Sequence, residues 1–248
     1  MLAIIGGSGL TQLANLEVVR REVMRTPYGD PSGAITLGTI RGRDVAFLAR
    51  HGYGHTIPPH KVNYRANMWA LAQLEVKYVL GVASVGGIRP DLTPGTLAIP
   101  DQIIDYTYGR EFTYFTGIDR SVVHVDFTQP YCEALRQRLV QAALQAGEPV
   151  LEGGTYAATQ GPRLETAAEI DRLERDGADM VGMTGMPEAA LARELGICYA
   201  AIAVVVNYAA GRADSAAGIK LSDINAVSRE ALARVHGIFD YLVTLDGD

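Results

Sequence analysis

The stretch CYAAIAVVVNYAAG, residues 198–211, decides the fold. Its first nine residues are apolar and rich in valine, a composition typical of a strand buried on both faces of a parallel sheet. The run ends at Asn207, an uncharged amide, and small residues follow. Such an amide lies where α/β proteins bind ligands, although an Asx turn that closes the strand explains it equally well. The rest of the chain has to decide between the two interpretations.

Similar apolar runs occur along the whole chain and alternate with helical patterns. Strands are predicted over residues 2–5, 34–40, 45–49, 78–83, 96–100, 155–159, 179–182 and 198–207. Helices are predicted over residues 62–74, 130–146, 165–176, 186–195 and 222–245, the last of them capped by Ser222. Residues 106–124 form a long irregular excursion of the kind that is often functional. The alternation predicts a single α/β domain, residues 1–248, with a mostly parallel or mixed sheet.

Composition and charge exclude several classes of partner. With 248 residues, 48% of them hydrophobic, the chain can build a full core. The net charge is −6 and the basic residues are scattered, which argues against nucleic-acid binding. The sequence has neither a signal-peptide pattern nor a stretch of membrane-spanning length, so we expect no membrane contact and a cytoplasmic protein. Cys132 and Cys198 belong to no metal-binding pattern, and we expect two buried thiols.

Two motifs at predicted strand ends offer hydrogen-bond donors to an anion. The sequence GGSG, residues 6–9, lets backbone N–H groups converge beside a serine hydroxyl, although a plain tight turn explains it as well. Arg50 and His51 follow another strand, where the guanidinium can hold an oxyanion through two bonds and the imidazole can add a third donor. His55 and His60 lie nearby in a loop rich in glycine and proline, a spacing that argues against a metal site.

Two further motifs place polar side chains at predicted helix starts. In TQGPRLETAAE, residues 159–169, Glu165 lies in the first helical turn, where a carboxylate stays ionised and acts as an acceptor. An ordinary glutamate at a helix start is the alternative. In DMVGMTGMPEAALA, residues 179–192, Met183 and Thr184 lie between a strand and a helix, which adds a hydroxyl and free N–H groups.

The order of these motifs resembles the trimeric purine nucleoside phosphorylase and methylthioadenosine phosphorylase family over nearly the whole chain. The resemblance rests on IIGGSGL, ARHGYGHTIPPHKVNYRANMWAL, SVGGIR, TQGPRLETAAE and GMTGMPEAALARELGICYAAIAVVVN. It implies the nucleoside phosphorylase fold, a central mixed sheet flanked by helices, and a homotrimer in which each site includes residues of a neighbour. The implied reaction is phosphorolysis, in which inorganic phosphate attacks the anomeric carbon while the purine leaves. Phosphate is then a co-substrate, and no cofactor or metal is implied.

The same resemblance implies a role for each singled-out residue. The residues similar to those that bind phosphate are Ser8, Arg50, His51, Ser84 and Thr184. Those similar to base-binding residues are Leu164, Glu165 and Asn207. Those similar to residues on the ribose and 5′ side are Met183, Leu221, Ile224 and His124, the last of which would reach the site of an adjacent subunit. Asn207 and His51 are expected to take part in catalysis.

Departures from the methylthioadenosine branch of the family point to the substrate. That branch has aspartates at the positions of Asn207 and Ala209 and a serine at Glu165, whereas this sequence follows the 6-oxopurine branch at Asn207 and Glu165. A 6-oxopurine presents an N1–H donor and an O6 acceptor, which suit a carboxylate and an amide N–H, and adenine reverses both. The 5′ side is apolar at Leu221 and Ile224. The resemblance therefore implies cleavage of S-methyl-5′-thioinosine to hypoxanthine and 5-methylthioribose 1-phosphate, in purine salvage.

Other functions stay open. Phosphorolysis of S-methyl-5′-thioadenosine, or of inosine and guanosine, would use most of the same motifs. A dinucleotide-dependent oxidoreductase would use the glycine-rich first turn for pyrophosphate, but the third glycine is missing at the required offset. A non-catalytic purine-binding protein could share the base contacts, yet it would not need Arg50, His51 and Thr184 around one anion.

Overall fold

The computed structural model describes residues 1–117 and 121–245, and its strands and helices alternate along the chain. The strands are β1 (Leu2–Gly6), β2 (Glu17–Glu22), β3 (Ile35–Ile40), β4 (Arg43–Ala49), β5 (Tyr78–Gly87), β6 (Leu97–Ile99), β7 (Gln102–Asp105), β8 (Val150–Glu152), β9 (Thr155–Ala158), β10 (Met180–Gly182) and β11 (Cys198–Tyr208). The helices are α1 (Tyr64–Gln73), α2 (Glu133–Gln145), α3 (Ala167–Arg175), α4 (Gly185–Glu194) and α5 (Leu221–Leu242). The expected α/β fold is confirmed. Each helix in the described part of the chain is too short or too polar to span a bilayer.

The strands form one mixed sheet with β5 at its centre. β5 pairs in parallel with β1 and with β11, and its last residues pair antiparallel with β10. From β1 the sheet continues through β4 and β3 to β2, and from β10 it continues through β9 to β7. β11 also pairs with β6, which pairs with β8. Because β1, β4, β5 and β11 are parallel, the residues that follow them meet at one edge of the sheet.

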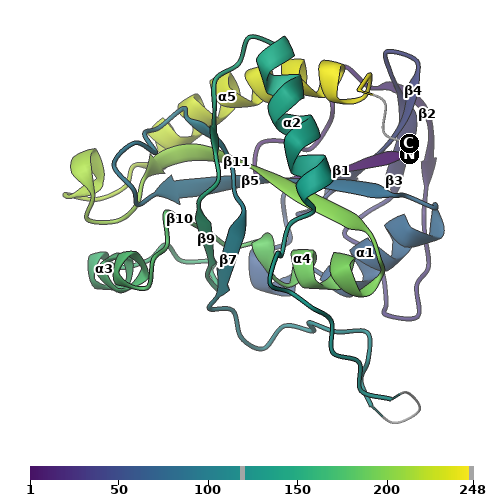
Figure 1. Cartoon of the computed structure of the whole chain (residues 1–248), viewed down its shortest axis with the longest axis horizontal. Coiled ribbons are helices and arrows are strands. Elements are labelled where there is room, and N and C mark those ends of the chain that lie inside the picture. Colours follow the sequence, from purple (N-terminus) through teal and green to yellow (C-terminus); the bar gives the residue numbers. More distant parts are fainter. Residues whose placement is uncertain (118–120, 246–248) are drawn as a thin grey trace.

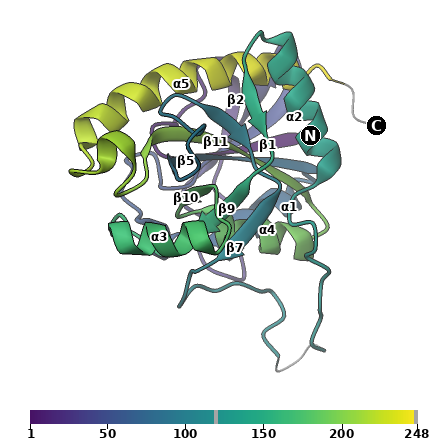
Figure 2. The ribbon, with the colours of Figure 1, turned by 60° about the vertical axis from the view of Figure 1, so that its left-hand side comes forward.

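Helices cover both faces of this sheet (Figure 1). α2 and α5 lie on one face and α1 and α4 lie on the other, as the turned view in Figure 2 also shows. The side chains of β11 alternate accordingly: Ala200, Ile202 and Val204 pack in the core cluster of α2 and α5. Tyr199, Ala201 and Ala203 pack in the core cluster of α1 and α4. Burial on both faces explains why residues 198–206 are apolar without interruption.

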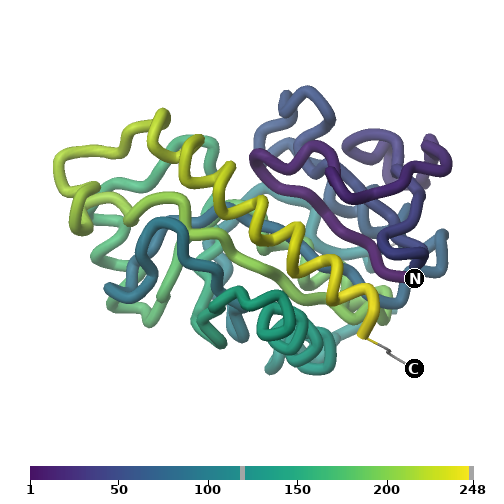
Figure 3. Tube along the Cα trace, turned by 90° about the horizontal axis from the view of Figure 1, so that it is seen from above, coloured from purple at the N-terminus to yellow at the C-terminus, as the bar shows by residue number. Residues whose placement is uncertain are grey.

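α5 runs across one face of the molecule (Figure 3). Ala231, Val235, Ile238 and Leu242 follow at spacings of three or four residues, and all are buried against the sheet. The predicted cap at Ser222 is wrong: the helix begins at Leu221 after Lys220, which makes no capping bond through its side chain. The Ser222 hydroxyl instead contacts the carboxylate of Asp223 at 3.0 Å.

Three strands were missed in the sequence. β2 is an edge strand that pairs with β3, and five of its six residues are exposed. Four of the six are charged, so β2 shows no apolar alternation. β7 and β8 have four and three residues, which is too short for a periodic signal. All three are held in the sheet by pairing, β2 with β3, β7 with β9 and β8 with β6.

The two cysteines form a disulfide, so the expectation of two buried thiols is wrong. Cys132 precedes α2 and Cys198 opens β11, and their Cα atoms lie 5.2 Å apart. The backbone N–H of Cys132 donates to the carbonyl oxygen of Tyr199 at 2.7 Å. This contact between segments 66 residues apart along the chain aligns the two cysteines, and sequence separation alone could not predict it.

The expected excursion is present in the described residues of 106–130, which contain no helix or strand. In Figure 1 it extends away from the sheet between β7 and α2. Its apolar side chains Tyr108, Phe112 and Val122 are exposed. Arg110, in contrast, is buried and ties the excursion to the body of the molecule.

Candidate active site

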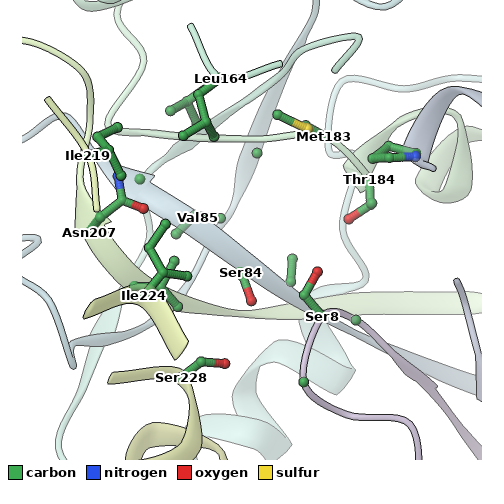
Figure 4. Close-up of a pocket in the computed structure, with 18 of the residues that line it drawn as sticks. Ser8, Ser84, Val85, Leu164, Met183, Thr184, Asn207, Ile219, Ile224 and Ser228 are labelled. Atoms are coloured by element: carbon green, nitrogen blue, oxygen red, sulfur yellow. The ribbon is translucent and has the colours of Figure 1, made fainter. Parts of the chain in front are cut away.

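A cavity of about 260 Å³ opens at the edge of the sheet where β1, β4, β5 and β11 end. Ten of the twelve residues singled out in the sequence line it: Ser8, Arg50, His51, Ser84, Leu164, Glu165, Met183, Thr184, Asn207 and Ile224. Figure 4 shows Ser8 and Thr184 on one side of the cavity and Asn207 on the other. The fold thus gathers residues from motifs up to 216 positions apart, Ser8 to Ile224, around one space.

Two singled-out residues lie outside the cavity. Leu221 is at the first position of α5, with 69% of its surface exposed, and its side chain is not part of the cavity lining. His124 is exposed on the excursion and is also absent from the lining. Leu221 and Ile224 were expected to line one apolar pocket together. Within one chain, only Ile224 lines the cavity.

Arg50 is held beneath the cavity by a buried carboxylate. Its Nε and Nη2 each donate to one carboxylate oxygen of Glu188 at 2.7 Å, and its Nη1 donates to the carbonyl oxygen of Val82 at 2.8 Å. Arg50 and Glu188 are each only 1% exposed. Burial alone would lower the pKa of Arg50, but the attraction of Glu188 outweighs it and raises that pKa. One N–H on each terminal nitrogen remains for an anion.

Glu188 is fixed in turn by Tyr199 and by a glycine. The Tyr199 hydroxyl donates to Oε1 of Glu188 at 2.7 Å, and the Tyr199 ring stacks on Tyr131. A Cβ at Gly81 would lie 2.3 Å from the Tyr199 hydroxyl, so only glycine leaves room for this pair. The role of Glu188 was missed in the sequence, where it is one more acidic residue in the first turn of a helix.

His51 is buried and neutral. Its Nδ1 lies 2.8 Å from the carbonyl oxygen of Ile57, so Nδ1 carries the proton and donates to that oxygen. Burial and the neighbouring Arg50 cation lower the pKa of His51 to about 4. At pH 7 the ring therefore offers Nε2 as an acceptor. This differs from the sequence expectation of a third donor to an anion.

Close packing explains two glycines at the end of β1. A Cβ at Gly6 would lie 2.2 Å from the carbonyl oxygen of Leu10, and one at Gly7 would lie 2.5 Å from that of Val82. The same Cβ at Gly7 would lie 3.2 Å from Nη1 of Arg50. Any larger residue here would push the turn that carries Ser8 away from the guanidinium.

A β-bulge turns Asn207 into the cavity. The pairing of β11 with β5 shifts between Val205 and Asn207, and both Val206 and Asn207 line the cavity. Two consecutive side chains can face one space only where the strand alternation is interrupted. The Asn207 amide Nδ2 donates to the carbonyl oxygen of Tyr208 at 2.6 Å, which holds the amide in one orientation. Asn207 is thus not simply an Asx turn that ends the strand.

Glu165 lies just before α3 and not in its first turn, because the helix begins at Ala167. Thr166 is the N-cap, and it forms a capping box with Glu169. One carboxylate oxygen of Glu165 accepts a hydrogen bond from the Thr159 hydroxyl at 2.6 Å. Glu165 and Leu164 line the cavity from the turn that joins β9 to α3.

Several lining residues were missed in the sequence. Ile219 and, from α5, Asn225, Ser228 and Arg229 complete the wall beside Ile224. In Figure 4, Ile219 lies next to Asn207, with Ile224 below it. The helical spacing of residues 224, 225 and 228 identifies one face of α5, but only the three-dimensional structure shows that this face turns from the core into the cavity.

Arg110 was also missed, and it joins the two turns that carry Glu165 and Met183. Its Nη1 donates to the carbonyl oxygens of Met183 at 2.9 Å and Met186 at 2.6 Å. Its Nη2 donates to those of Thr159 at 3.2 Å and Gln160 at 2.9 Å. The sequence offers no signal for this role, since Arg110 lies in an irregular segment.

The described residues contain no group of three or more His, Cys, Asp or Glu side chains that could hold a metal ion. His51 and His55 come close, with ring centroids 4.9 Å apart, but no carboxylate or thiolate joins them into such a group within residues 1–117 and 121–245. The donors that line the cavity, a guanidinium and hydroxyls, suit an anion better than a cation.

The cavity and fold define the class of protein. The family model described as Phosphorylase superfamily matches residues 1–244, and the chain belongs to this family. The family resemblance read from the sequence is thereby confirmed, and the chain is an enzyme of that superfamily.

Within the superfamily, the chain is similar to phosphorylases that act on purine nucleosides and their methylthio derivatives, as the names of these relatives state. The chain is 54% identical over 233 residues to a protein of Pseudomonas syringae pv. tomato named probable S-methyl-5′-thioinosine phosphorylase, covering 94% of each chain. It is 50% identical over 215 residues to the 6-oxopurine nucleoside phosphorylase of Pyrococcus furiosus, covering 85% of this chain and 80% of the other. The structure of methylthioadenosine phosphorylase from Schistosoma mansoni in complex with adenine matches with a TM-score of 0.94 at 32% identity, over 98% of this chain and 91% of that one.

Proposed function

We propose that the chain catalyses the phosphorolysis of S-methyl-5′-thioinosine, which yields hypoxanthine and 5-methylthioribose 1-phosphate. The observation that carries this proposal is that Glu165 and Asn207 line the same cavity as Arg50. An anion-binding group and a pair of groups suited to a 6-oxopurine then act on one substrate complex. Relatives that carry the corresponding name at 52–55% identity support the same assignment.

Phosphate binds at the Arg50 end of the cavity. Two N–H groups of Arg50 are not used by Glu188 or Val82, and they can donate to two phosphate oxygens, with the Ser8 and Thr184 hydroxyls and the backbone of Ser84 nearby. Neutral His51 can accept the P–OH proton of monohydrogen phosphate through Nε2. Phosphate held in this way is positioned to attack C1′, which is the main catalytic contribution that binding can make.

The purine binds between Glu165 and Asn207, beside Leu164. The Glu165 carboxylate accepts the N1–H of a 6-oxopurine. The Asn207 amide keeps one N–H that Tyr208 does not use, and this N–H donates to O6 and N7, which are both acceptors. When the C1′–N9 bond breaks, its electron pair moves into the purine, and a hydrogen bond from Asn207 stabilises the charge that develops there. Adenine would leave these groups without partners once the bound purine covers them, at a cost of about 1–3 kcal/mol each.

The ribose lies over Met183, and its 5′-methylthio group lies against Ile219 and Ile224. These two side chains supply the apolar part of a wall that Asn225 and Ser228 also line, and their hydrocarbon suits a thioether better than the hydroxyl of inosine. The reaction requires no cofactor. A cytoplasmic location, expected from the sequence, remains a prediction.

We further propose that the active form is a homotrimer in which His124 of one subunit lies at the 5′ end of a neighbouring site. The exposed Tyr108, Phe112 and Val122 of the excursion support a contact surface there. Contacts that close a ring, with different surfaces meeting at each interface, would then place each excursion at the next cavity. Static light scattering should give three times the 26.6 kDa chain mass, and an active monomer would contradict the proposal.

Steady-state kinetics with S-methyl-5′-thioinosine, S-methyl-5′-thioadenosine and inosine, each with and without phosphate, test the substrate and the reaction together. We expect strict phosphate dependence and a kcat/KM for methylthioinosine roughly 100-fold above that for methylthioadenosine. The Asn207→Asp variant should narrow this difference. Base release at an undiminished rate without phosphate would indicate a hydrolase, and equal use of the two methylthio nucleosides would exclude the assigned base contacts.

A further inference from the structure

Thr159 contacts the proposed base-binding carboxylate from outside the substrate cavity. Glu165 lines two cavities, the substrate cavity and a second one, and Thr159 lines only the second, together with Gln160 and Tyr108. The Thr159 hydroxyl lies 2.6 Å from Oε1 of Glu165. Thr159 is therefore placed to act on the substrate through Glu165 and not by direct contact.

The Thr159 hydroxyl has one proton and two possible acceptors. The Glu165 oxygen lies at 2.6 Å, and the carbonyl oxygen of Gly182 lies at 3.2 Å. The shorter contact is to a carboxylate, and hydrogen bonds to charged acceptors are shorter and stronger than those to neutral ones. The carbonyl of Gly182 already accepts the backbone N–H of Thr159 at 2.8 Å, so it does not depend on the hydroxyl. The proton therefore goes to Glu165.

Both ends of this hydrogen bond lie on segments that are held in place by neighbouring side chains. On one side, Thr159 follows β9, and Arg110 binds the carbonyl oxygens of Thr159 and Gln160. On the other side, the turn with Glu165 is held by the capping box of α3 and by Arg163, whose two terminal nitrogens donate to the Glu169 carboxylate at 2.8 and 2.7 Å. The position of the Thr159 hydroxyl therefore sets the orientation of the Glu165 carboxylate.

We propose that Thr159 is a positioning residue that determines base specificity by fixing Glu165 as a hydrogen-bond acceptor. With one oxygen occupied by the hydroxyl, the other oxygen faces the purine and accepts the N1–H of hypoxanthine. Adenine has a lone pair at N1 and needs a donor, which a carboxylate that already accepts the Thr159 proton does not provide. This inference rests on the proposed function, because it assigns the same cavity to a 6-oxopurine.

Thr159→Val and Thr159→Ser are matched tests, since valine keeps the shape and removes the hydroxyl, whereas serine keeps the hydroxyl. We expect Thr159→Val to lower the ratio of kcat/KM for methylthioinosine to that for methylthioadenosine by about tenfold or more, the worth of one hydrogen bond to a charged group. Thr159→Ser should stay within about threefold of the natural enzyme, because the hydrogen bond is retained. The KM for phosphate should not change in either variant, since phosphate binds at the other end of the cavity.

The outcomes separate this inference from the proposed function. If the natural enzyme prefers methylthioadenosine or works without phosphate, the proposed function fails. If the natural enzyme behaves as proposed and Thr159→Val keeps its base preference, or loses activity on both nucleosides equally, the role of Thr159 is overturned. Should Thr159→Val not fold, as judged by circular dichroism, Thr159→Ala gives the same comparison, with binding of free hypoxanthine and adenine measured by calorimetry as a second readout.

Discussion

At the residue scale, the charges buried beneath the cavity are arranged before any substrate is present. Arg50 has a bidentate partner in Glu188 and lines the cavity, and a Cβ at Gly7 would lie only 3.2 Å from its Nη1. A guanidinium without such a partner would be costly to bury, and its orientation would vary. The anion-binding role of Arg50 was predictable from its place after a strand. Its contact with Glu188 was not, because Glu188 lies 138 positions further along the chain.

Glu188→Gln tests this arrangement. The amide can accept from only one nitrogen of Arg50 and leaves the cation without a counter-charge, so we expect the free energy of unfolding to fall by about 3–5 kcal/mol. The KM for phosphate should rise at least tenfold, with little change in the KM for the nucleoside. Glu230→Gln, on the exposed side of α5, is the control for loss of a carboxylate. An unchanged KM for phosphate in a folded Glu188→Gln enzyme would contradict the positioning role.

His51 makes a pH-dependent contribution to stability. Its pKa falls from about 6.5 in the unfolded chain to about 4 in the folded one, so the unfolded chain binds the proton more readily between these values. The contribution is therefore complete above pH 6.5 and is lost as the pH falls toward 4. We expect about 2 kcal/mol less stability at pH 4.5 than at pH 7 from this residue. Urea unfolding of the natural protein and of His51→Gln should show that the loss of stability from pH 7 to pH 4.5 differs by this amount between the two proteins. An identical loss in both would show that folding does not lower the pKa of His51.

At the scale of elements, strands with a buried apolar run were predictable, whereas the charged edge strand β2 and the partly exposed strands β7 and β8 were not. The runs at residues 198–207 and 2–5 correspond to β11 and β1, which are buried on both faces and so carry a strong apolar signal. The site followed from strand ends, which is why Ser8, Arg50 and Asn207 were found. The bulge before Asn207 depends on strand pairing, and the start of α3 after Glu165 depends on helix capping. Neither the strand pairing nor the exact capping residue could be predicted from the sequence pattern.

The first turns of α5 allow a test of the 5′ end. Ile224 lines the cavity, whereas Leu221, one turn earlier, is exposed. We expect Ile224→Ser to reduce the preference for methylthioinosine over inosine roughly tenfold, because the thioether loses an apolar wall. Leu221→Ser makes the same polar change outside the cavity and should leave the preference unaltered. The ratio of kcat/KM for methylthioinosine to that for inosine, measured for both variants, tests this expectation. A larger change in Leu221→Ser than in Ile224→Ser would contradict it and would indicate that Leu221 lines a site in the assembled oligomer.

At the scale of the whole molecule, the disulfide joins the start of α2 to the start of β11. It closes a loop across 66 positions, which in the chain-entropy estimate stabilises the folded state by about 4 kcal/mol. We therefore expect dithiothreitol to lower the Tm by several degrees, measured by differential scanning fluorimetry. The double variant Cys132→Ser, Cys198→Ser should already have the lower Tm and should not respond to the reductant. A natural protein that is equally indifferent to reductant would show that the bond contributes little.

The edge strand β2 matters for how crowded copies of the protein behave. A strand at the end of a sheet leaves one row of backbone donors and acceptors open, and another chain can add to it and begin an aggregate. Glu17, Arg20, Arg21 and Glu22 surround the exposed Val18 and Val19 on β2. A second copy docking in the same register would have to bring like charges together and dehydrate them. The polarity that concealed this strand from sequence analysis thus also disfavours edge-to-edge association between copies of the protein.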